Sequence, residues 1–327
     1  MPLRSFRDYG LGNSPLREVP HYCPNGRLFI KLEMVNPHGS IKDRTAFYLL
    51  RDIQRRGQLR SDVTIVESSS GNLGMALGHL ARDAGVRFVC LMDHSIPPEK
   101  HAELSDAGIE VEIVGRGRYP DCRTARMRRA EELGNHEGWL WTNQYANSAN
   151  VLAHYETTGR EIWEQTDGAV AFVVCSAGTA GTICGIGQCL KERNKHVTVV
   201  AVEPLGSTLF GGCEGDYLSV GAGLRGPSRI LHRHGHVIDY FCKMDDATAI
   251  AECLRLQQAE GLDVGITTGS VLRVGSMIAS EHPEDIVVVV SPDGGEKYAH
   301  LIHDVSPSPE VRETVRLTPF HWEGLDG

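Results

Sequence analysis

The chain has 327 residues, enough for two lobes around a large shared core, and its 41% hydrophobic and 23% charged residues are typical of an α/β protein. A formal net charge of −9 argues against a surface that binds nucleic acids or anionic membranes. The sequence shows no apolar segment of a signal peptide and no apolar run of about 18 residues. We therefore expect a cytoplasmic protein without a transmembrane helix.

Short apolar runs alternate with longer helical patterns along the chain. The predicted strands are residues 28–32, 64–67, 87–92, 110–114, 171–175, 197–202 and 286–290. The predicted helices are residues 44–57, 72–84, 99–107, 153–164, 182–193, 247–260 and 270–280. This alternation predicts an α/β fold in which helices cover both faces of parallel sheets. The polar, Pro-rich residues after Ser306 are expected to form a loose extension.

Lys42 follows a predicted strand and opens a predicted helix, in the segment Asn-Pro-His-Gly-Ser-Ile-Lys-Asp-Arg that runs from Asn36 to Arg44. Partial desolvation beside the positive end of a helix dipole favours the uncharged form of a lysine amine. An uncharged amine is a nucleophile towards an aldehyde. The other interpretation is a solvated lysine at a helix start, and this segment alone leaves both open.

A second polar segment, Glu-Ser-Ser-Ser-Gly-Asn-Leu-Gly, runs from Glu67 to Gly74 between another predicted strand and helix. Its hydroxyl groups and the amides of a helix N-terminus can bind a carboxylate. A serine-rich helix cap is the alternative. Further along, the basic stretch from Arg116 to Arg129 is typical of a solvated helix face, although one of its arginines can turn inward towards an anion.

The segment Ser-Ala-Gly-Thr-Ala-Gly-Thr, from Ser176 to Thr182, also joins a predicted strand to a helix. Its glycines allow close backbone approach, and its threonines and the helix N-terminus can bind a phosphate. A dinucleotide site, with Glu203 as the ribose ligand, is the alternative. The Gly-x-Gly-x-x-Gly spacing is absent, however, because Gly185 and Gly187 fall inside the predicted helix. A monophosphate therefore fits better.

Cysteines and histidines indicate no metal site. The nine cysteines are odd in number, contain no Cys-x-x-Cys pair and lie in part in apolar runs. This pattern predicts reduced, buried thiols, none of which is a candidate nucleophile. His232, His234 and His236 have a spacing that metal sites use, but we interpret this segment as a solvated loop because spacing alone is weak evidence.

Together and in this order, the segments resemble the fold-type II pyridoxal-phosphate enzymes, and among them the cysteine synthase group. The resemblance extends from Leu-Gly-Asn-Ser-Pro-Leu at residues 11–16 to Pro-Asp-Gly-Gly-Glu-Lys-Tyr at residues 292–298. It implies a pyridoxal 5'-phosphate cofactor, small amino-acid substrates, a homodimer, and a tryptophan synthase β-like fold of two open, twisted, mostly parallel sheets with flanking helices. The implied domains are a smaller mobile one with the substrate-carboxylate loop at 45–148, a larger cofactor-binding one at 1–44 and 149–306, and the extension at 307–327.

The resemblance also implies roles for individual residues. Lys42 matches the lysine that holds the cofactor as a Schiff base and acts as base on the α-proton. Thr267 matches the hydroxyl that faces the pyridine nitrogen. The remaining residues that match the cofactor site are Asn72, Gly178, Thr179, Ala180, Gly181 and Thr182. The residues expected to bind the substrate are Ser69, Ser70, Asn72, Gln144, Tyr145 and Arg123.

The identity of Thr267 favours one type of reaction. A hydroxyl group cannot keep the pyridine nitrogen protonated as an aspartate can, so the cofactor is a weaker electron sink. Elimination of a β-substituent to an aminoacrylate, followed by addition of a nucleophile, is then favoured over transamination.

Several residues depart from ordinary cysteine synthases. Leu73, Tyr145 and Ser176 stand where threonine, phenylalanine and glycine are usual. The first two, and Gly-Ser-x-x-Phe-Gly at residues 206–211, are similar to the N-(2-amino-2-carboxyethyl)-L-glutamate synthases of siderophore pathways. Those enzymes join O-phosphoserine to glutamate on the way to 2,3-diaminopropionate.

Tyr119 followed by Arg123 also matches that subgroup, so Arg123 is our candidate for a contact to a substrate anion, whereas Gly178 is like a cysteine synthase. We therefore expect β-replacement on O-phospho-L-serine by an amino-acid amine, in the first place that of L-glutamate. One alternative is a cysteine synthase that acts on O-acetylserine or O-phosphoserine, and another is a serine or threonine dehydratase. A NAD-dependent dehydrogenase would need the absent glycine pattern, and a non-catalytic homologue would lack Lys42.

Overall fold

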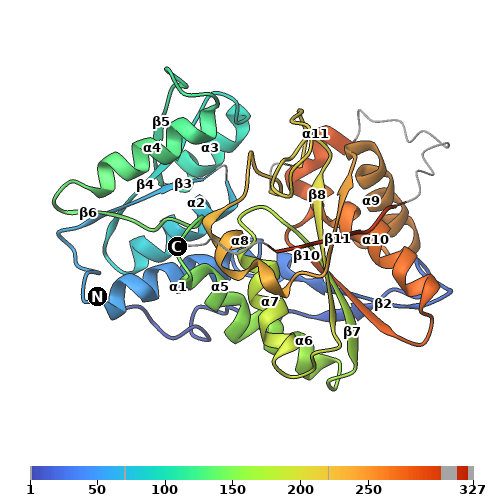
Figure 1. Ribbon diagram of the computed structural model, residues 1–327. Coiled ribbons are helices and arrows are strands. Elements are labelled where there is room, and N and C mark those ends of the chain that lie inside the picture. Colours follow the sequence, from blue (N-terminus) through green and yellow to red (C-terminus); the bar gives the residue numbers. More distant parts are fainter. Residues whose placement is uncertain (1, 70, 220, 303–314, 323–327) are drawn as a thin grey trace. The chain divides into compact units, whose positions relative to one another are not determined.

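The chain divides into two compact units, drawn in Figure 1. The residues that this computed structural model describes are 2–69, 71–219, 221–302 and 315–322. Unit 1 comprises residues 1–11 and 42–150, and unit 2 comprises residues 12–41 and 151–327. The first residues belong to unit 1, although the sequence-based division placed them in the larger domain. The reason is aromatic packing, since the ring centroid of Phe6 lies 5.3 Å from that of Phe47 and 6.0 Å from that of Tyr48.

Unit 2 is built on a seven-stranded sheet in the order β1-β2-β10-β7-β8-β9-β11. The central strands pair in parallel, and the edge strands β1 and β11 pair antiparallel with their neighbours. The strands are β1 (Leu16–Glu18), β2 (Arg27–Leu32), β7 (Val170–Ser176), β8 (Thr198–Pro204), β9 (Tyr240–Met244), β10 (Ile286–Ser291) and β11 (Thr318–Pro319). Of these, β1, β9 and β11 were not predicted, because they are short or lack a continuous apolar run.

Helices cover both faces of this sheet, with α6 and α7 on one side and α9 and α10 on the other (Figure 1). The helices are α6 (Gly159–Gln165), α7 (Gly181–Lys191), α8 (Arg229–His234), α9 (Asp246–Glu260), α10 (Ile266–Glu281) and α11 (Ala299–Ile302). The 3-10 turns are η1 (Glu33–Val35), η3 (Gly235–Val237) and η4 (Gly295–Tyr298), and η2 (His154–Thr158) is a π-helix. Burial on both faces explains why the central strands are apolar without alternation.

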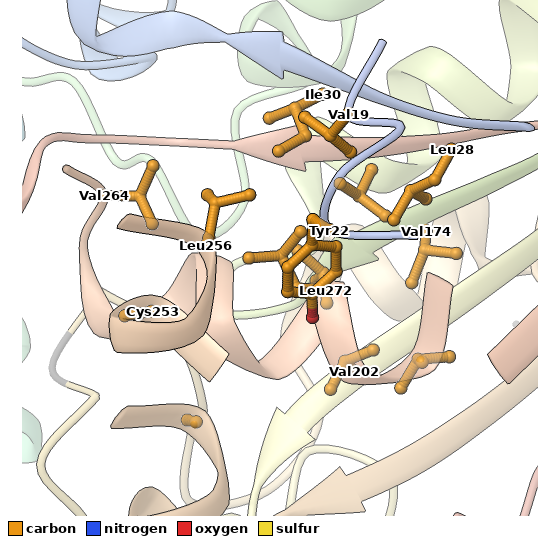
Figure 2. Packing of buried hydrophobic residues seen from close by; sticks show 14 of the residues in the cluster. Val19, Tyr22, Leu28, Ile30, Val174, Val202, Cys253, Leu256, Val264 and Leu272 are labelled. Atoms are coloured by element: carbon orange, nitrogen blue, oxygen red, sulfur yellow. The ribbon is translucent and has the colours of Figure 1, made fainter. Parts of the chain in front are cut away.

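The main core of unit 2 lies between this sheet and α10. Figure 2 shows Leu28, Val174 and Val202, from three strands, gathered around Leu272. All four side chains are at most 1% exposed. Burial of each contributes on the order of 1.5–3 kcal/mol to folding.

Unit 1 is a smaller sheet of four parallel strands in the order β5-β4-β3-β6. The strands are β3 (Thr64–Ser68), β4 (Arg87–Met92), β5 (Glu110–Ile113) and β6 (Trp139–Trp141). The helices are α1 (Lys42–Arg55), α2 (Asn72–Asp83), α3 (Pro98–Asp106) and α4 (Cys122–Gly134), and α5 (Ala149–Ala153) crosses the division between the units. The predicted class, an α/β fold with two mostly parallel sheets and flanking helices, is confirmed.

The prediction that the residues after Ser306 form a loose extension is wrong for residues 315–322, the part that the structure describes. Thr318 pairs with Phe241 of β9, and the ring of Phe320 lies 5.2 Å from that of Phe210. This tail segment, residues 315–322, belongs to the packed edge of the sheet because its aromatic side chains find apolar partners there. Residues 307–314 and 323–327 lie outside the described residues.

The prediction of a solvated loop at His232, His234 and His236 is also wrong. His232 and His234 lie on α8, which begins at the capping residue Ser228. His236 lies on the following turn, with its ring 5.5 Å from that of Trp322. The capping hydroxyl and the packing of this turn on the tail segment explain the difference, and neither is visible as a helical apolar pattern.

All nine cysteines are free thiols, and seven of them are buried, as the sequence predicted. Burial raises the pKa of the Cys184 and Cys253 thiols to about 12, which keeps both in the unreactive protonated form. In the described part of the chain, no helix is both long enough and apolar enough to span a membrane.

Candidate functional site

The loop between β7 and α7 has the backbone features of an anion-binding turn. Ala180 adopts a left-handed conformation, with φ of 66°, immediately before α7. Gly178 lies at a crowded point, where a Cβ atom would be 3.3 Å from the carbonyl oxygen of Gly221. Left-handed and helical residues in succession turn their amides to one side, and the N-terminus of a helix carries positive partial charge. The loop therefore suits a phosphate group.

A neighbouring loop and a helix cap hold this turn in place. The amide of Gly223 donates to the carbonyl of Ala177 at 2.7 Å. The hydroxyl of Ser228 donates to the carbonyl of Thr179 at 2.7 Å and accepts from the amide of Leu231 at 3.0 Å. Ser228 thus joins the start of α8 to the phosphate loop. The only signal for this support in the sequence is a serine before a helical stretch.

Thr267 lies in the first turn of α10 and is only 1% exposed. Its hydroxyl oxygen has no hydrogen-bond partner among the described residues. The methyl group of Thr267 and the hydroxyl of Tyr298 each lie 3.7 Å from where a Cβ atom of Gly221 would stand. A buried hydroxyl without a partner costs about 1–3 kcal/mol, so it indicates a missing ligand atom. This hydroxyl and the glycine-lined turn fit a phosphorylated heteroaromatic cofactor.

Lys42 is the first residue of α1 and is half-buried. The preceding residue, Ile41, belongs to unit 2, where its amide donates to the carbonyl of Pro292 at 2.8 Å. The next residue after Pro292 is Asp293, which accepts a hydrogen bond from the hydroxyl of Tyr298 at 3.0 Å. The chain therefore enters α1 from the carboxyl end of β10. The phosphate loop leaves β7 at the same edge of this sheet.

In unit 1, the serine-rich segment forms a tight turn from β3 into α2. The Ser69 hydroxyl oxygen accepts hydrogen bonds from the amides of Gly71 at 3.2 Å and Gly74 at 3.0 Å. The hydroxyl proton of Ser69 can then donate to another group. Asn72 is the first residue of α2 and is half-buried, and Ser70 lies outside the described residues.

The buried carboxylate of Glu67 joins this turn to a second loop of unit 1. It accepts hydrogen bonds from the hydroxyl of Thr142, from the amide of Gln144 at 3.0 Å and from the amide of Ser68 at 2.8 Å. The Gln144 side-chain amide donates to the carbonyl of Ser68 at 2.9 Å. Burial raises the pKa of Glu67 to about 7, although its hydrogen bonds lower it. No role for Glu67 was predicted from the sequence, where the available signal was an acidic residue at the end of an apolar strand.

One arginine of the basic stretch does turn inward, and it is Arg126. Its guanidinium is 2.7 Å from the carboxylate of Asp93, and both side chains are at most 5% exposed. Arg123, in the first turn of α4, is half-buried, as is Tyr145 in the loop that follows β6. A substrate role for Arg123 and Tyr145 therefore stays a prediction.

Glu203 is not available as a ribose ligand. It is fully buried, its carboxylate lies 2.7 Å from the Lys243 ammonium, and it accepts hydrogen bonds from the hydroxyl of Ser207 and the amide of Leu209. These contacts organise the loop that follows β8. The dinucleotide alternative loses the residue on which it depended.

The fold and these loops define a class of α/β proteins with two parallel-sheet units, a turn that suits a phosphate and a lysine that begins a helix. The chain belongs to the pyridoxal-phosphate-dependent enzyme family, whose model matches residues 8–293. It is thus an enzyme that uses pyridoxal phosphate.

Solved structures that the chain resembles narrow the type of reaction. O-acetyl serine sulfhydrylase isoform 3 from Entamoeba histolytica is 27% identical, with a TM-score of 0.84, over 94% of this chain and 93% of that one. O-acetylserine-dependent cystathionine beta-synthase from Helicobacter pylori is 26% identical, with a TM-score of 0.83, over 92% and 98%. O-ureido-L-serine synthase is 30% identical, with a TM-score of 0.85, over 95% and 98%. The chain is a β-substituting enzyme of the cysteine synthase type.

Proposed function

We propose that this enzyme replaces the phosphate of O-phospho-L-serine with the amine of L-glutamate, giving a precursor of 2,3-diaminopropionate. The observation that carries the proposal is the combination of Leu73, Tyr145 and the Gly-Ser-x-x-Phe-Gly segment at residues 206–211, which resembles the N-(2-amino-2-carboxyethyl)-L-glutamate synthases. The similar structures are named for different products at 26–30% identity. The acceptor therefore varies within this fold, and residues around the substrate must select it.

The residues that hold the cofactor in this proposal are those that the resemblance implies. Pyridoxal phosphate supplies, when bound, an electron sink for the bond to the α-proton of an amino acid. Lys42 binds it through the side-chain amine and, once released, accepts the α-proton at Nζ. Thr267 gives its unpartnered hydroxyl to the ring nitrogen, and Asn72 binds the 3' oxygen. The phosphate ligands are Gly178, Thr179, Ala180, Gly181 and Thr182.

The turn after β3 is proposed to bind the substrate carboxylate. Ser69 has a hydroxyl proton left to donate, because its oxygen accepts from two backbone amides. The side chain of Gln144 uses one amide proton on the carbonyl of Ser68 and keeps a second. Ser70 and Asn72 complete the set. Hydrogen bonds from neutral donors hold a carboxylate without a buried ion pair.

Arg123 and Tyr145 are proposed to select the anionic substrates. A guanidinium binds phosphate or carboxylate through two parallel N–H groups, and a phenol adds a polar group that a phenylalanine lacks. The proposal includes a homodimer and a smaller mobile domain at residues 45–148, both of which rest on the resemblance. It also includes a cytoplasmic location, which rests on the sequence features described above.

The product formed from defined substrate pairs tests the proposal. The holoenzyme is incubated with O-phospho-L-serine or O-acetyl-L-serine, each with L-glutamate, with sulfide, or with a pool of other amino acids and thiols. Mass spectrometry identifies the products, and we expect the highest kcat/KM for O-phospho-L-serine with L-glutamate. If a product forms only when sulfide is the acceptor, the proposal is contradicted and the enzyme is a cysteine synthase.

A matched pair of arginine variants tests the anion contact. Arg123→Gln is expected to raise the KM for O-phospho-L-serine about tenfold, since a charge-assisted hydrogen bond is lost. Arg128→Gln is the control, because Arg128 is exposed on the same helix and pairs with Glu131 at 2.6 Å. Equal KM values in the two variants would remove Arg123 from the substrate site.

A further inference from the structure

A π-helix packs directly against α7, the helix that the phosphate loop opens. In η2 the amide of Gly159 donates to the carbonyl of His154, five residues earlier. On the facing helix, a Cβ atom at Gly185 would lie 2.3 Å from the carbonyl oxygen of Val151 and 2.8 Å from Cβ of His154. The two backbones therefore touch at this glycine. π-helical turns are rare and occur frequently at functional sites.

The His154 side chain is fully buried between two threonine hydroxyls. Its Nδ1 atom lies 3.0 Å from Oγ1 of Thr158, and its Nε2 atom lies 3.3 Å from Oγ1 of Thr182. Thr182 is the second residue of α7 and the last residue of the proposed phosphate loop. The imidazole thus bridges the π-helix and that loop.

A neutral imidazole has one donor and one acceptor nitrogen, so only two arrangements satisfy both contacts. In one, Nδ1 donates to Thr158 and the Thr182 hydroxyl donates to Nε2, which leaves only lone pairs of Thr182 to face an anion. In the other, Thr158 donates to Nδ1, and Nε2 donates to Thr182. The Thr182 proton is then left for the loop. A phosphate in the loop stabilises this second arrangement, because its oxygens only accept hydrogen bonds.

We infer that His154 is a positioning residue, which acts as the Nε2–H tautomer and aims the hydroxyl proton of Thr182 at the cofactor phosphate. The inference rests on the proposed role of residues 178–182 as phosphate ligands. The hydrogen-bond relay then runs from Thr158 through His154 to Thr182 and ends on the phosphate. The π-helix places both ring nitrogens in reach of a hydroxyl, which gives this irregular turn a function.

Two substitutions of His154 separate this role from packing. Glutamine places an amide nitrogen near the position of Nε2 and can donate to Thr182, whereas asparagine is shorter and reaches only the position of Nδ1. We expect His154→Asn to raise the dissociation constant of pyridoxal phosphate about tenfold, and His154→Gln to raise it less than about threefold. Titration of the apoenzyme with the cofactor measures this constant, and the ³¹P NMR shift of the bound phosphate should move in the asparagine variant only.

The control on the same π-helix is Tyr155→Phe, since Tyr155 bonds to Glu192 near the surface and not to the loop. The dissociation constant of pyridoxal phosphate from this variant should equal that from the wild type. Thr158→Val is a second variant that leaves the phosphate loop and the imidazole intact. It removes the hydroxyl that donates to Nδ1. We therefore expect it to raise the dissociation constant of pyridoxal phosphate, as His154→Asn does.

A double-mutant cycle with Thr182→Val tests whether His154 acts through Thr182. We expect Thr182→Val to weaken cofactor binding about tenfold and His154→Asn to add nothing in that background, because the relay has lost its last member. The relay is excluded if His154→Asn raises the dissociation constant by the same factor in both backgrounds, or if the His154→Gln and His154→Asn variants bind the cofactor equally. Neither result would exclude the phosphate loop. If Thr182→Val leaves the dissociation constant unchanged, the phosphate role of this threonine fails, and the inference falls with it.

Discussion

Glu67 shows how one residue joins parts of unit 1 that are distant in the sequence. Its partners Thr142 and Gln144 lie 75 and 77 residues away, yet all belong to one buried group. A carboxylate without water is costly unless donors surround it, and here four groups donate to it. The pKa of Glu67 still rises to about 7 because desolvation outweighs these hydrogen bonds. The turn at Ser69 and the loop of Gln144 are therefore coupled through one titratable group.

The titration of Glu67 predicts a pH dependence of stability. The folded protein binds the proton more tightly than the unfolded chain, whose carboxyl has its ordinary pKa of 4.5. The contribution of this group to the free energy of unfolding is therefore largest below pH 4.5 and declines as the pH rises to about 7, by on the order of 3 kcal/mol. Urea denaturation of wild type and Glu67→Gln between pH 5 and 8 should show this decline in the wild type only.

The control for this experiment is Glu110→Gln, an identical change at a half-exposed residue of the same sheet that pairs with Arg87. Its pH dependence should follow the wild type. Parallel curves for the wild type and Glu67→Gln would show that Glu67 does not titrate in this range.

At the level of elements, α7 depends on glycines for its close contacts. Gly185 meets the backbone of residues 151–155, and a Cβ atom at Gly187 would lie 2.9 Å from Val237. Both glycines lie on a helix, where glycine is unfavourable by about 1 kcal/mol relative to alanine. The close packing of this helix, whose N-terminus belongs to the proposed phosphate loop, offsets that cost.

Gly185→Ala is therefore expected to destabilise unit 2 by about 3 kcal/mol or more, because a methyl group 2.3 Å from a backbone oxygen forces the helices apart. The midpoint of chemical denaturation measures the change. Gly115→Ala is the control, since nothing lies within 4 Å of its Cβ position, and it should leave the midpoint unchanged. A similar midpoint in both variants would show that α7 can shift at no cost.

At the level of the whole chain, the seven-stranded sheet ends in short antiparallel strands on both sides. The β1 strand pairs with β2, and β11 of the tail segment pairs with β9. Long unpaired edges of a sheet invite association with other chains, so short edge strands protect the folded chain from aggregation. The rings of Phe210 and Phe241 stack with centroids 5.0 Å apart, and Phe320 packs edge-on against Phe210. The tail segment therefore stabilises unit 2.

Phe320→Ala should lower the free energy of unfolding by about 1–2 kcal/mol, because a half-buried ring and its aromatic contacts are lost. His321→Ala, at the exposed neighbour, is the matched control and should change stability by less than about 0.5 kcal/mol. Thermal denaturation and light scattering measure stability and edge association. Equal melting temperatures for the two variants would show that the tail segment contributes nothing.

The fold class, and the turns proposed for the site, could be predicted from local patterns. Apolar runs such as residues 286–290 predicted buried parallel strands, since a strand covered on both faces has no polar side. Gly178 and Thr182 predicted a phosphate turn for a similarly local reason, because an anion-binding turn before a helix needs glycine and exposed amides. Such features depend on residues that are neighbours in the chain, so they can be predicted from the sequence alone.

Other features depend on partners that meet only in the folded chain. No local pattern distinguishes Arg126, which turns inward to Asp93, from the exposed Arg128, and none gives Glu67 its raised pKa. The residues after Ser306 are polar and Pro-rich in sequence, yet Phe320 packs against an aromatic pair more than 70 residues earlier. Propensity and periodicity act over a few residues, whereas burial and hydrogen bonding depend on which distant segments the fold brings together.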